Sequence, residues 1–320
     1  MSHVEARTAA PLPGLPGSST DPGTGALAEP LLEYLMDDAG LLDDAGLLDD
    51  AGLLDDAGRP HAHRPSVAEV VEGHRDRLRS DLAHLLGPLV VPAELAEPFA
   101  EALTAGDDGL RVLLVAPDGT PAGRHRLRAA RDLLAEDERV AIVGVRIGVP
   151  PGPPALSTAA LLTMLDFTVP AWIEVPPGPD ATEVLRGVAT DGAEEITLMA
   201  TPGTDDRALA ALVRAVLDDD QSFRMVVGAG TELVRTDARH GLLNLLAAVR
   251  AGVDGATEGE LTRILACREP APLASGLRQL SDTDAAVTRA HLASIEVTDV
   301  AATQARLLTL GLLSPPEWAD

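Results

Sequence analysis

Short apolar stretches alternate with amphipathic stretches from about Pro88 to Gly230. This alternation is typical of repeated βα units, in which parallel strands form a sheet and helices pack on it. The sequence therefore predicts an α/β fold with a parallel six-stranded βα-repeat domain. We expect its strands over Leu89–Pro92, Arg111–Pro117, Val140–Val149, Val169–Val175, Glu195–Thr201 and Phe223–Gly230.

Apolar residues recur at helical spacing between these strands. The clearest case follows the fifth strand, where Asp205 precedes an apolar face made by Leu209, Leu212, Val213, Val216 and Leu217. After the sixth strand we expect only helices, over Gly241–Arg250, Thr257–Ala266, Asp282–Ile295 and Thr298–Leu313. Six parallel strands fit either an incomplete β/α barrel or a doubly wound open sheet, and the pattern leaves both open.

The first 65 residues have a different composition, rich in Pro, Gly, Ser and Asp. The hexapeptide LLDDAG occurs three times between Leu41 and Gly58, after a degenerate copy, LMDDAG. Six residues advance about 600° around a helix, so the leucine pairs do not share a face. We predict a disordered, low-complexity acidic tail over residues 1–65, with a calcium-binding or partner-binding segment as the alternative. The βα-repeat domain then spans 66–235, beginning at the candidate N-cap Ser66, and a helical C-terminal part spans 236–320.

Composition excludes several classes of function. A formal net charge of −25 opposes binding to nucleic acid or to an anionic membrane. The chain has neither a 20-residue apolar run nor the apolar core of a secretory signal, so we expect a cytoplasmic protein. Cys267 is the single cysteine, and there is no lysine. The absence of lysine excludes Schiff-base aldolases, lysine-anchored pyridoxal-phosphate enzymes, Walker-type P-loops and protein kinases.

Two motifs at first suggest ligand binding. The turn VVGAG places Gly228 and Gly230 after the sixth strand, where backbone N–H groups either bind an anion or simply form a tight turn. Its continuation has Leu233 in place of the third glycine of a dinucleotide fingerprint. The other motif is the pair His61 and His63, which lies in a Pro-flanked linker without a second ligand cluster. The sequence thus predicts no cofactor and no metal site.

Charged residues lie within or just after the predicted strands. They are Arg146, Glu174, Arg224, Glu232 and Arg235. Parallel sheets bind their ligands at this edge, so Arg146, Arg224 and Arg235 are candidate ligands for an anionic substrate. Glu174 interrupts an apolar strand, which favours either proton transfer or an ion pair with Arg146 or Arg224.

His240 and Asn244 lie one helical turn apart at the start of an apolar helix. They are candidates for a catalytic and a substrate-binding residue, respectively, if both face the glycine turn. Helix capping and hydrogen bonding between helices is the alternative.

The segments GPLVVP (Gly87–Pro92) and HGLLNLL (His240–Leu246) resemble GPLVVP and HGFLNLL in a family of uncharacterised actinobacterial β/α-repeat proteins. The resemblance spans about Ser66 to Leu313 and implies the same βα repeats, without a known activity. Family strands resembling KLRTGG and FKATAGLHH here read TLMATPG and FRMVVGAGTEL. Thr197 and Arg224 therefore replace lysines, and the paired histidines are absent. The resemblance implies a degenerate or divergent member if the family is enzymatic.

The sequence supports two hypotheses of different classes. In the first, a small anionic metabolite, a carboxylate or a phosphate, binds at the carboxyl ends of the strands, with Glu174 and His240 as candidate proton-transfer groups. In the second, the chain is a non-catalytic scaffold that binds a protein partner or a second copy of itself, and its strand-end charges pair internally. Neither hypothesis requires a nucleic acid or a membrane.

Overall fold

The computed structural model describes residues 29–41, 65–81, 83–116, 119–149, 169–175, 181–190, 195–199, 204–226, 232–237 and 239–314. Within these ranges, eight parallel strands follow one another in sequence order and close into a barrel, because the last strand pairs with the first. The strands are β1 (Met36–Asp38), β2 (Leu86–Pro92), β3 (Leu110–Ala116), β4 (Val140–Gly148), β5 (Ala171–Val175), β6 (Glu195–Met199), β7 (Phe223–Val226) and β8 (Leu292–Val297).

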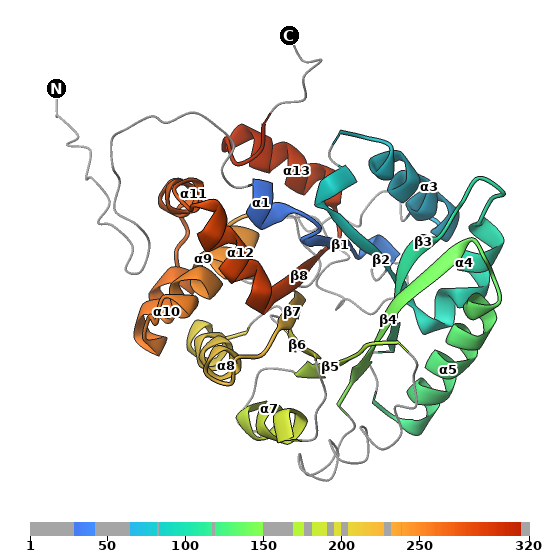
Figure 1. The fold of residues 1–320 in the computed structure, drawn as a ribbon, viewed down its shortest axis with the longest axis horizontal. Helices are drawn as coiled ribbons and strands as arrows, with labels where there is room; N and C mark the ends of the chain where they lie inside the picture. Colours follow the sequence, from blue (N-terminus) through green and yellow to red (C-terminus); the bar gives the residue numbers. More distant parts are fainter. Residues whose placement is uncertain are drawn as a thin grey trace.

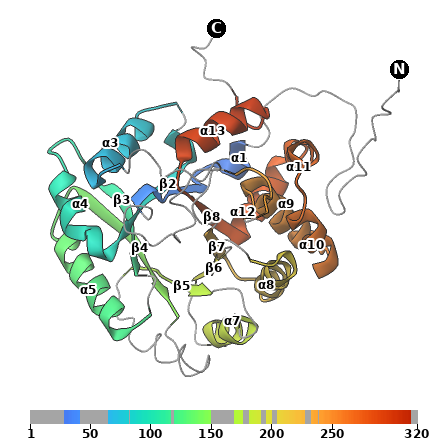
Figure 2. The same ribbon diagram turned by 180° about the vertical axis from the view of Figure 1, so that it is seen from behind.

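Helices surround the strands in both views of the ribbon (Figures 1 and 2). They are α1 (Glu29–Leu32), α3 (Val67–Leu78), α4 (Ala96–Ala102), α5 (Pro121–Ala135), α7 (Ala181–Thr190), α8 (Asp206–Asp218), α9 (Leu242–Val253), α10 (Glu258–Leu265), α11 (Pro270–Arg278), α12 (Asp282–His291) and α13 (Val300–Thr309), with 3₁₀ turns η2 (Ala83–Leu85) and η3 (Ala93–Leu95). None of these described helices has the length and apolar character needed to span a membrane.

Two predicted helix starts are confirmed. Ser66 accepts a hydrogen bond from the backbone N–H of Glu69, whose carboxylate accepts from the backbone N–H of Ser66, so α3 begins in a capping box. Asp205 caps α8 by accepting from the N–H of Ala208 at 3.1 Å. The predicted apolar face of α8 is buried.

The prediction of six strands in an incomplete barrel or open sheet is wrong in detail, because the barrel has eight strands and is closed. One missing strand, β1, lies in the degenerate hexapeptide LMDDAG, which we had placed in the tail. Its three residues are Met-Asp-Asp, and two adjacent aspartates give no apolar strand signal. The three LLDDAG copies lie almost wholly outside the described residues.

The other missing strand, β8, lies where we predicted helix. The helical pattern of α12 ends at His291, and the next residues, LASIEV, form the strand. Leu292 and Ile295 continue the apolar spacing of the helix, so the periodicity carried the helix prediction on to Ile295. A helix that was not predicted, α11, precedes α12.

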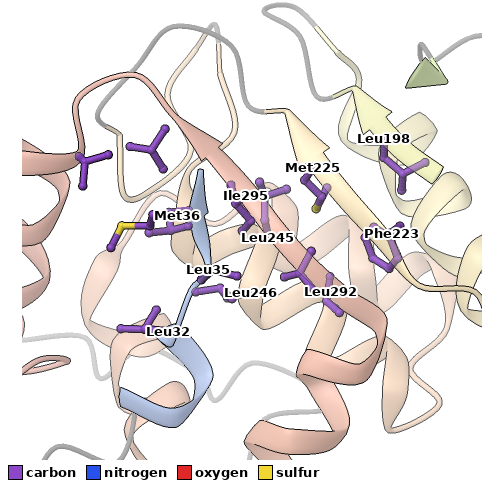
Figure 3. Packing of buried hydrophobic residues seen from close by; sticks show 14 of the residues in the cluster. Leu32, Leu35, Met36, Leu198, Phe223, Met225, Leu245, Leu246, Leu292 and Ile295 are labelled. Atoms are coloured by element: carbon purple, nitrogen blue, oxygen red, sulfur yellow. The ribbon is translucent and has the colours of Figure 1, made fainter. Parts of the chain in front are cut away.

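The main hydrophobic core lies between the barrel wall and the helices. Figure 3 shows Met225 of β7 and Ile295 of β8 near Leu245 and Leu246 of α9, all of which are buried. Side chains alternate between the two faces of a strand, so the remaining positions point into the barrel. There a separate, smaller apolar cluster contains Ala39, Val90, Leu113, Val115 and Trp172.

Candidate functional site

Polar side chains share the interior of the barrel with this small apolar cluster. They come from β1 and from the five strands β4 to β8, and all are buried: Asp37, Arg146, Glu174, Thr197, Arg224, Ser294 and Glu296. We call this set the barrel cluster. Strand register places four of them side by side, since Glu174 pairs with Thr197, Thr197 with Arg224, and Arg224 with Ser294.

The barrel cluster lies toward the carboxyl ends of the strands. Asp37, Glu174 and Glu296 each stand one residue before the last residue of their strand. Arg146 and Arg224 stand two residues before theirs. In parallel β/α barrels this end carries the ligand site, because the loops and helix N-termini that follow the strands converge there.

Two glycines make room for these side chains. A Cβ atom built on Gly87 would lie 2.1 Å from Oδ1 of Asp37, and one built on Gly144 would lie 1.6 Å from the ring of Trp172. Real Cβ contacts are never so close, so only glycine fits at either position. The sequence positions of both glycines are therefore set by the interior of the barrel.

Arg146 lies between two carboxylates. Its Nε is 2.8 Å from Oε1 of Glu174, and its Nη1 contacts Oε1 of Glu296. Burial lowers the pKa of Arg146 from its usual value, and the charges of Glu174 and Asp37 oppose that shift. The predicted alternative for Glu174, an ion pair with Arg146, is present.

Arg224 is held from two sides. Its Nη1 donates to Oδ2 of Asp37 at 2.5 Å, and its guanidinium carbon lies 4.0 Å from the ring centroid of Trp172. The same Oδ2 accepts a hydrogen bond from the hydroxyl of Ser294 at 2.6 Å. Burial raises the pKa of Asp37, while Arg224 and Ser294 act in the opposite direction.

Apart from the ion-paired atoms of Arg146, Glu174 and Glu296, several buried polar atoms of the barrel cluster and of the adjacent Trp172 have no hydrogen-bond partner among the described residues. Three are donors: Nε1 of Trp172, Oγ1 of Thr197 and Nε of Arg224. Two acceptors, Oδ1 of Asp37 and Oε2 of Glu296, also lack a hydrogen-bond partner among the described residues. A buried polar group without a partner is costly, so these atoms are candidates for contacts with water or with a small polar molecule.

The remaining predicted site residues lie elsewhere. Arg235 and His240 both bind Oδ1 of Asp206, the first residue of α8, at 2.8 and 2.7 Å. Asn244 accepts from the backbone N–H of Arg235 at 2.7 Å and donates to the carbonyls of Ile264 and Cys267 at 2.8 and 2.7 Å. We call Asp206, Arg235, His240 and Asn244 the helix cluster.

The helix cluster connects α8, α9 and the end of α10, which lie together on one side of the barrel (Figure 1). The charged groups that act on the pKa of His240 are Arg235, Asp206 and Asp205. Burial lowers the pKa of His240, with Arg235 contributing in the same direction. The expected meeting of Arg235, His240 and Asn244 with Arg224 is therefore not observed, and hydrogen bonding between helices, the alternative, is. Gly228 and Gly230 lie outside the described residues.

Sequence reasoning missed Asp37, Ser294 and Glu296. A signal for Glu296 was present, because the triplet Ile-Glu-Val occurs both at 173–175 and at 295–297, with the glutamate in the same place before the strand end. Asp37 lacked such a signal, since its strand is three residues long.

A groove of about 350 Å³ lies at the opposite end of the barrel, near the first residues of β2 and β3. Its lining includes Tyr34, Leu78 and Arg111. The amino ends of barrel strands support stability rather than ligand binding, so this groove is not the candidate site. The described residues contain no group of three or more His, Cys, Asp or Glu side chains that could hold a metal ion.

Fold and site together define a closed parallel β/α barrel with an ionic interior. No protein-family model, curated protein or solved structure matches the chain.

Proposed function

We propose that this β/α barrel binds a small anionic metabolite, a carboxylate or a phosphate, at the carboxyl ends of its strands, through Arg224 and Arg146. The observation that supports this most directly is the set of unpartnered donors on Trp172, Thr197 and Arg224. These donors require acceptor oxygens, and a carboxylate or phosphate supplies several from one group.

Arg224 is the better anion ligand of the two arginines. Arg146 already contacts two carboxylates, whereas Arg224 contacts one and keeps its Nε unused. Trp172 stacks on the Arg224 guanidinium and so fixes its plane. A planar guanidinium held in this way is preorganised for two parallel hydrogen bonds to an oxyanion.

Glu174 is the candidate proton-transfer group, because its carboxylate lies in the barrel cluster next to Thr197 in strand register. His240 loses that role in the proposal, since its ring binds Asp206 in the helix cluster. If the chain catalyses a reaction, the chemistry open to these residues is proton transfer on a bound anion. If it does not, the same residues form a binding site alone.

A non-catalytic scaffold is the second candidate. The observation that favours it is that each arginine of the barrel cluster already has a carboxylate partner within a closed barrel. Internal pairing of this kind needs no ligand.

Thermal unfolding with sulfate, phosphate and succinate separates the two candidates. A ligand at about 100 times its Kd stabilises the folded state by about 2.7 kcal/mol. We expect at least one anion to raise the Tm of the wild type and of Arg235→Gln, but not of Arg224→Gln. Stabilisation that survives in Arg224→Gln, or no stabilisation by any of the three anions, would favour the scaffold.

A further inference from the structure

We infer that an anion enters the barrel together with one proton, and that Asp37 carries this proton. The inference rests on the proposed function and adds to it the form in which the ligand binds: the barrel takes up an anion and a proton as a unit. The argument uses the charge balance of the barrel cluster and the contacts of Asp37.

The barrel cluster contains one carboxylate more than it has guanidinium groups. Its carboxylates are Asp37, Glu174 and Glu296, and its guanidiniums are Arg146 and Arg224. Fully ionised, the cluster therefore has a charge of 2 − 3 = −1. Any anion that binds there makes the buried charge more negative, which a low-dielectric interior strongly opposes. Taking up a proton offsets one unit of the negative charge that an anion brings.

Asp37 is the carboxylate that loses most when an anion arrives. Glu174 and Glu296 both contact Arg146, whereas Asp37 depends on Arg224, the arginine that the anion would bind. An anion that draws Arg224 away leaves Asp37 with the Ser294 hydroxyl as its partner. A neutral carboxylic acid is then the form of lower energy.

The contacts of Asp37 also show which of its two oxygens can carry the proton. Oδ2 accepts from Arg224 and Ser294, while Oδ1 has no partner among the described residues and points to the position opposite Gly87. Protonation turns an unpartnered acceptor into a donor. The new O–H group is one more hydrogen-bond donor in the barrel interior that can bind an oxygen of the anion.

The charged groups facing Asp37 come from several elements. Arg224 of β7, Arg146 of β4 and Arg289 at the end of α12 favour its ionised form. Glu296 of β8 is its partner in strand register and opposes ionisation. Burial outweighs the three arginines and already raises the pKa of Asp37 in the ligand-free barrel. Burial therefore already favours the protonated form of Asp37 more than in a free aspartate.

Sulfate is the probe that tests the inference, because it stays fully ionised across the working pH range. Its affinity is measured by calorimetry between about pH 5.5 and pH 8.5. If binding takes up one proton, the affinity for sulfate should fall up to tenfold for each unit by which the pH rises, over the range in which Asp37 is ionised in the free protein. Titrations at one pH in two buffers of different ionisation heat count the protons directly, and we expect close to one per sulfate.

Variants at two adjacent positions test whether Asp37 is the residue that carries the proton. Asp37→Asn removes the titrating group and one negative charge, so sulfate should bind at least about tenfold more tightly than to the wild type at pH 8 with no dependence on pH. Asp38→Asn is the matched control. Its carboxylate lies on the same strand but outside the barrel, where it binds His74 and Arg77 of α3. This variant should keep the wild-type pH dependence.

The possible results are distinct. Sulfate binding that does not vary with pH and takes up no proton overturns the inference and leaves the proposed function standing. A pH dependence that persists in Asp37→Asn but disappears in Glu296→Gln assigns the proton to Glu296 and also overturns it. No binding of sulfate, phosphate or succinate at any pH overturns the proposed function as well. If Asp37→Asn does not fold, the proton count on the wild type still decides whether uptake occurs, and Glu296→Gln decides the carrier.

Discussion

The barrel cluster and the helix cluster have similar chemistry but different completeness. Each contains arginine and carboxylate side chains, which are buried in the barrel cluster and partly buried in the helix cluster. In the helix cluster, both polar atoms of the Asn244 side chain are used in hydrogen bonds, and the single arginine is balanced by a single aspartate. In the barrel cluster, donors and acceptors remain unpartnered and the charges do not balance. Among the described buried atoms, the helix cluster leaves only Nδ1 of His240 without a hydrogen-bond partner. The two clusters therefore differ in charge balance and in the number of unpartnered atoms, and both differences favour the barrel cluster as the candidate site.

The largest expected effect is the loss of stability caused by a substitution in the barrel cluster. Arg146→Met keeps the side-chain length but leaves Glu174 and Glu296 buried without their cation, which should cost about 3–5 kcal/mol of unfolding free energy. The matched variant in the helix cluster, Arg235→Met, leaves Asp206, which is 22% exposed and also bound to His240, and should cost much less. Denaturant unfolding measures both. Equal losses would remove the electrostatic distinction between the clusters.

The next effect tests whether the helix cluster is structural. Asn244→Ala leaves one backbone N–H and two carbonyls without their partner, so we expect a loss of about 2–3 kcal/mol. Sulfate affinity should stay at the wild-type value, because the variant does not touch the barrel interior. If the variant has wild-type stability but binds sulfate more weakly, Asn244 is a ligand-binding residue and not a structural one.

A smaller effect is expected for Trp172→Phe. The phenyl ring still packs on Arg224, but the unpartnered Nε1 donor is gone. One neutral hydrogen bond contributes about 0.5–1.5 kcal/mol, so sulfate affinity should fall about two- to tenfold. Unfolding free energy without ligand should stay the same or rise, since a buried unpartnered donor has been removed. Unchanged affinity would show that the indole N–H does not face the ligand.

The smallest expected effect is the pH dependence of the stability that His240 contributes in the helix cluster. Burial lowers the folded-state pKa of His240 below its usual value of 6.5. The neutral ring therefore contributes stability that is present above pH 6.5 and is lost as the pH falls through the lowered pKa. Unfolding free energies of the wild type and His240→Gln, measured from pH 8 to pH 5, should converge toward low pH. A difference that stays constant with pH would contradict a depressed pKa.

The sequence predicted the elements that have a strong apolar period. All six expected strands are present, and each end lies within four residues of the predicted one. Helix α8 has the expected cap and apolar face. Closure of the barrel was not predictable in the same way. It depends on β1, whose Met-Asp-Asp sequence is held by pairing with β2 and β8 rather than by its own propensity.

Side-chain parity accounts for the predicted site residues that lie together in the structure. Arg146, Glu174 and Arg224 lie inside strands, so alternation alone brings them into the barrel. Arg235, His240 and Asn244 follow a strand, and there the path of the chain decides which side chains meet. That path is fixed by long-range partners such as Asp206 and the carbonyl of Cys267, which no local spacing reveals.

The central claim is that the barrel cluster receives an anion, and the indole N–H of Trp172 reports on it directly. The sequence contains two tryptophans, so a ¹H–¹⁵N spectrum has two indole signals, and Trp318→Phe assigns them. We predict that sulfate shifts the Trp172 signal in a saturable way, in wild type and in Arg235→Gln but not in Arg224→Gln. A Trp172 signal that stays in place at saturating sulfate, phosphate and succinate would contradict the account.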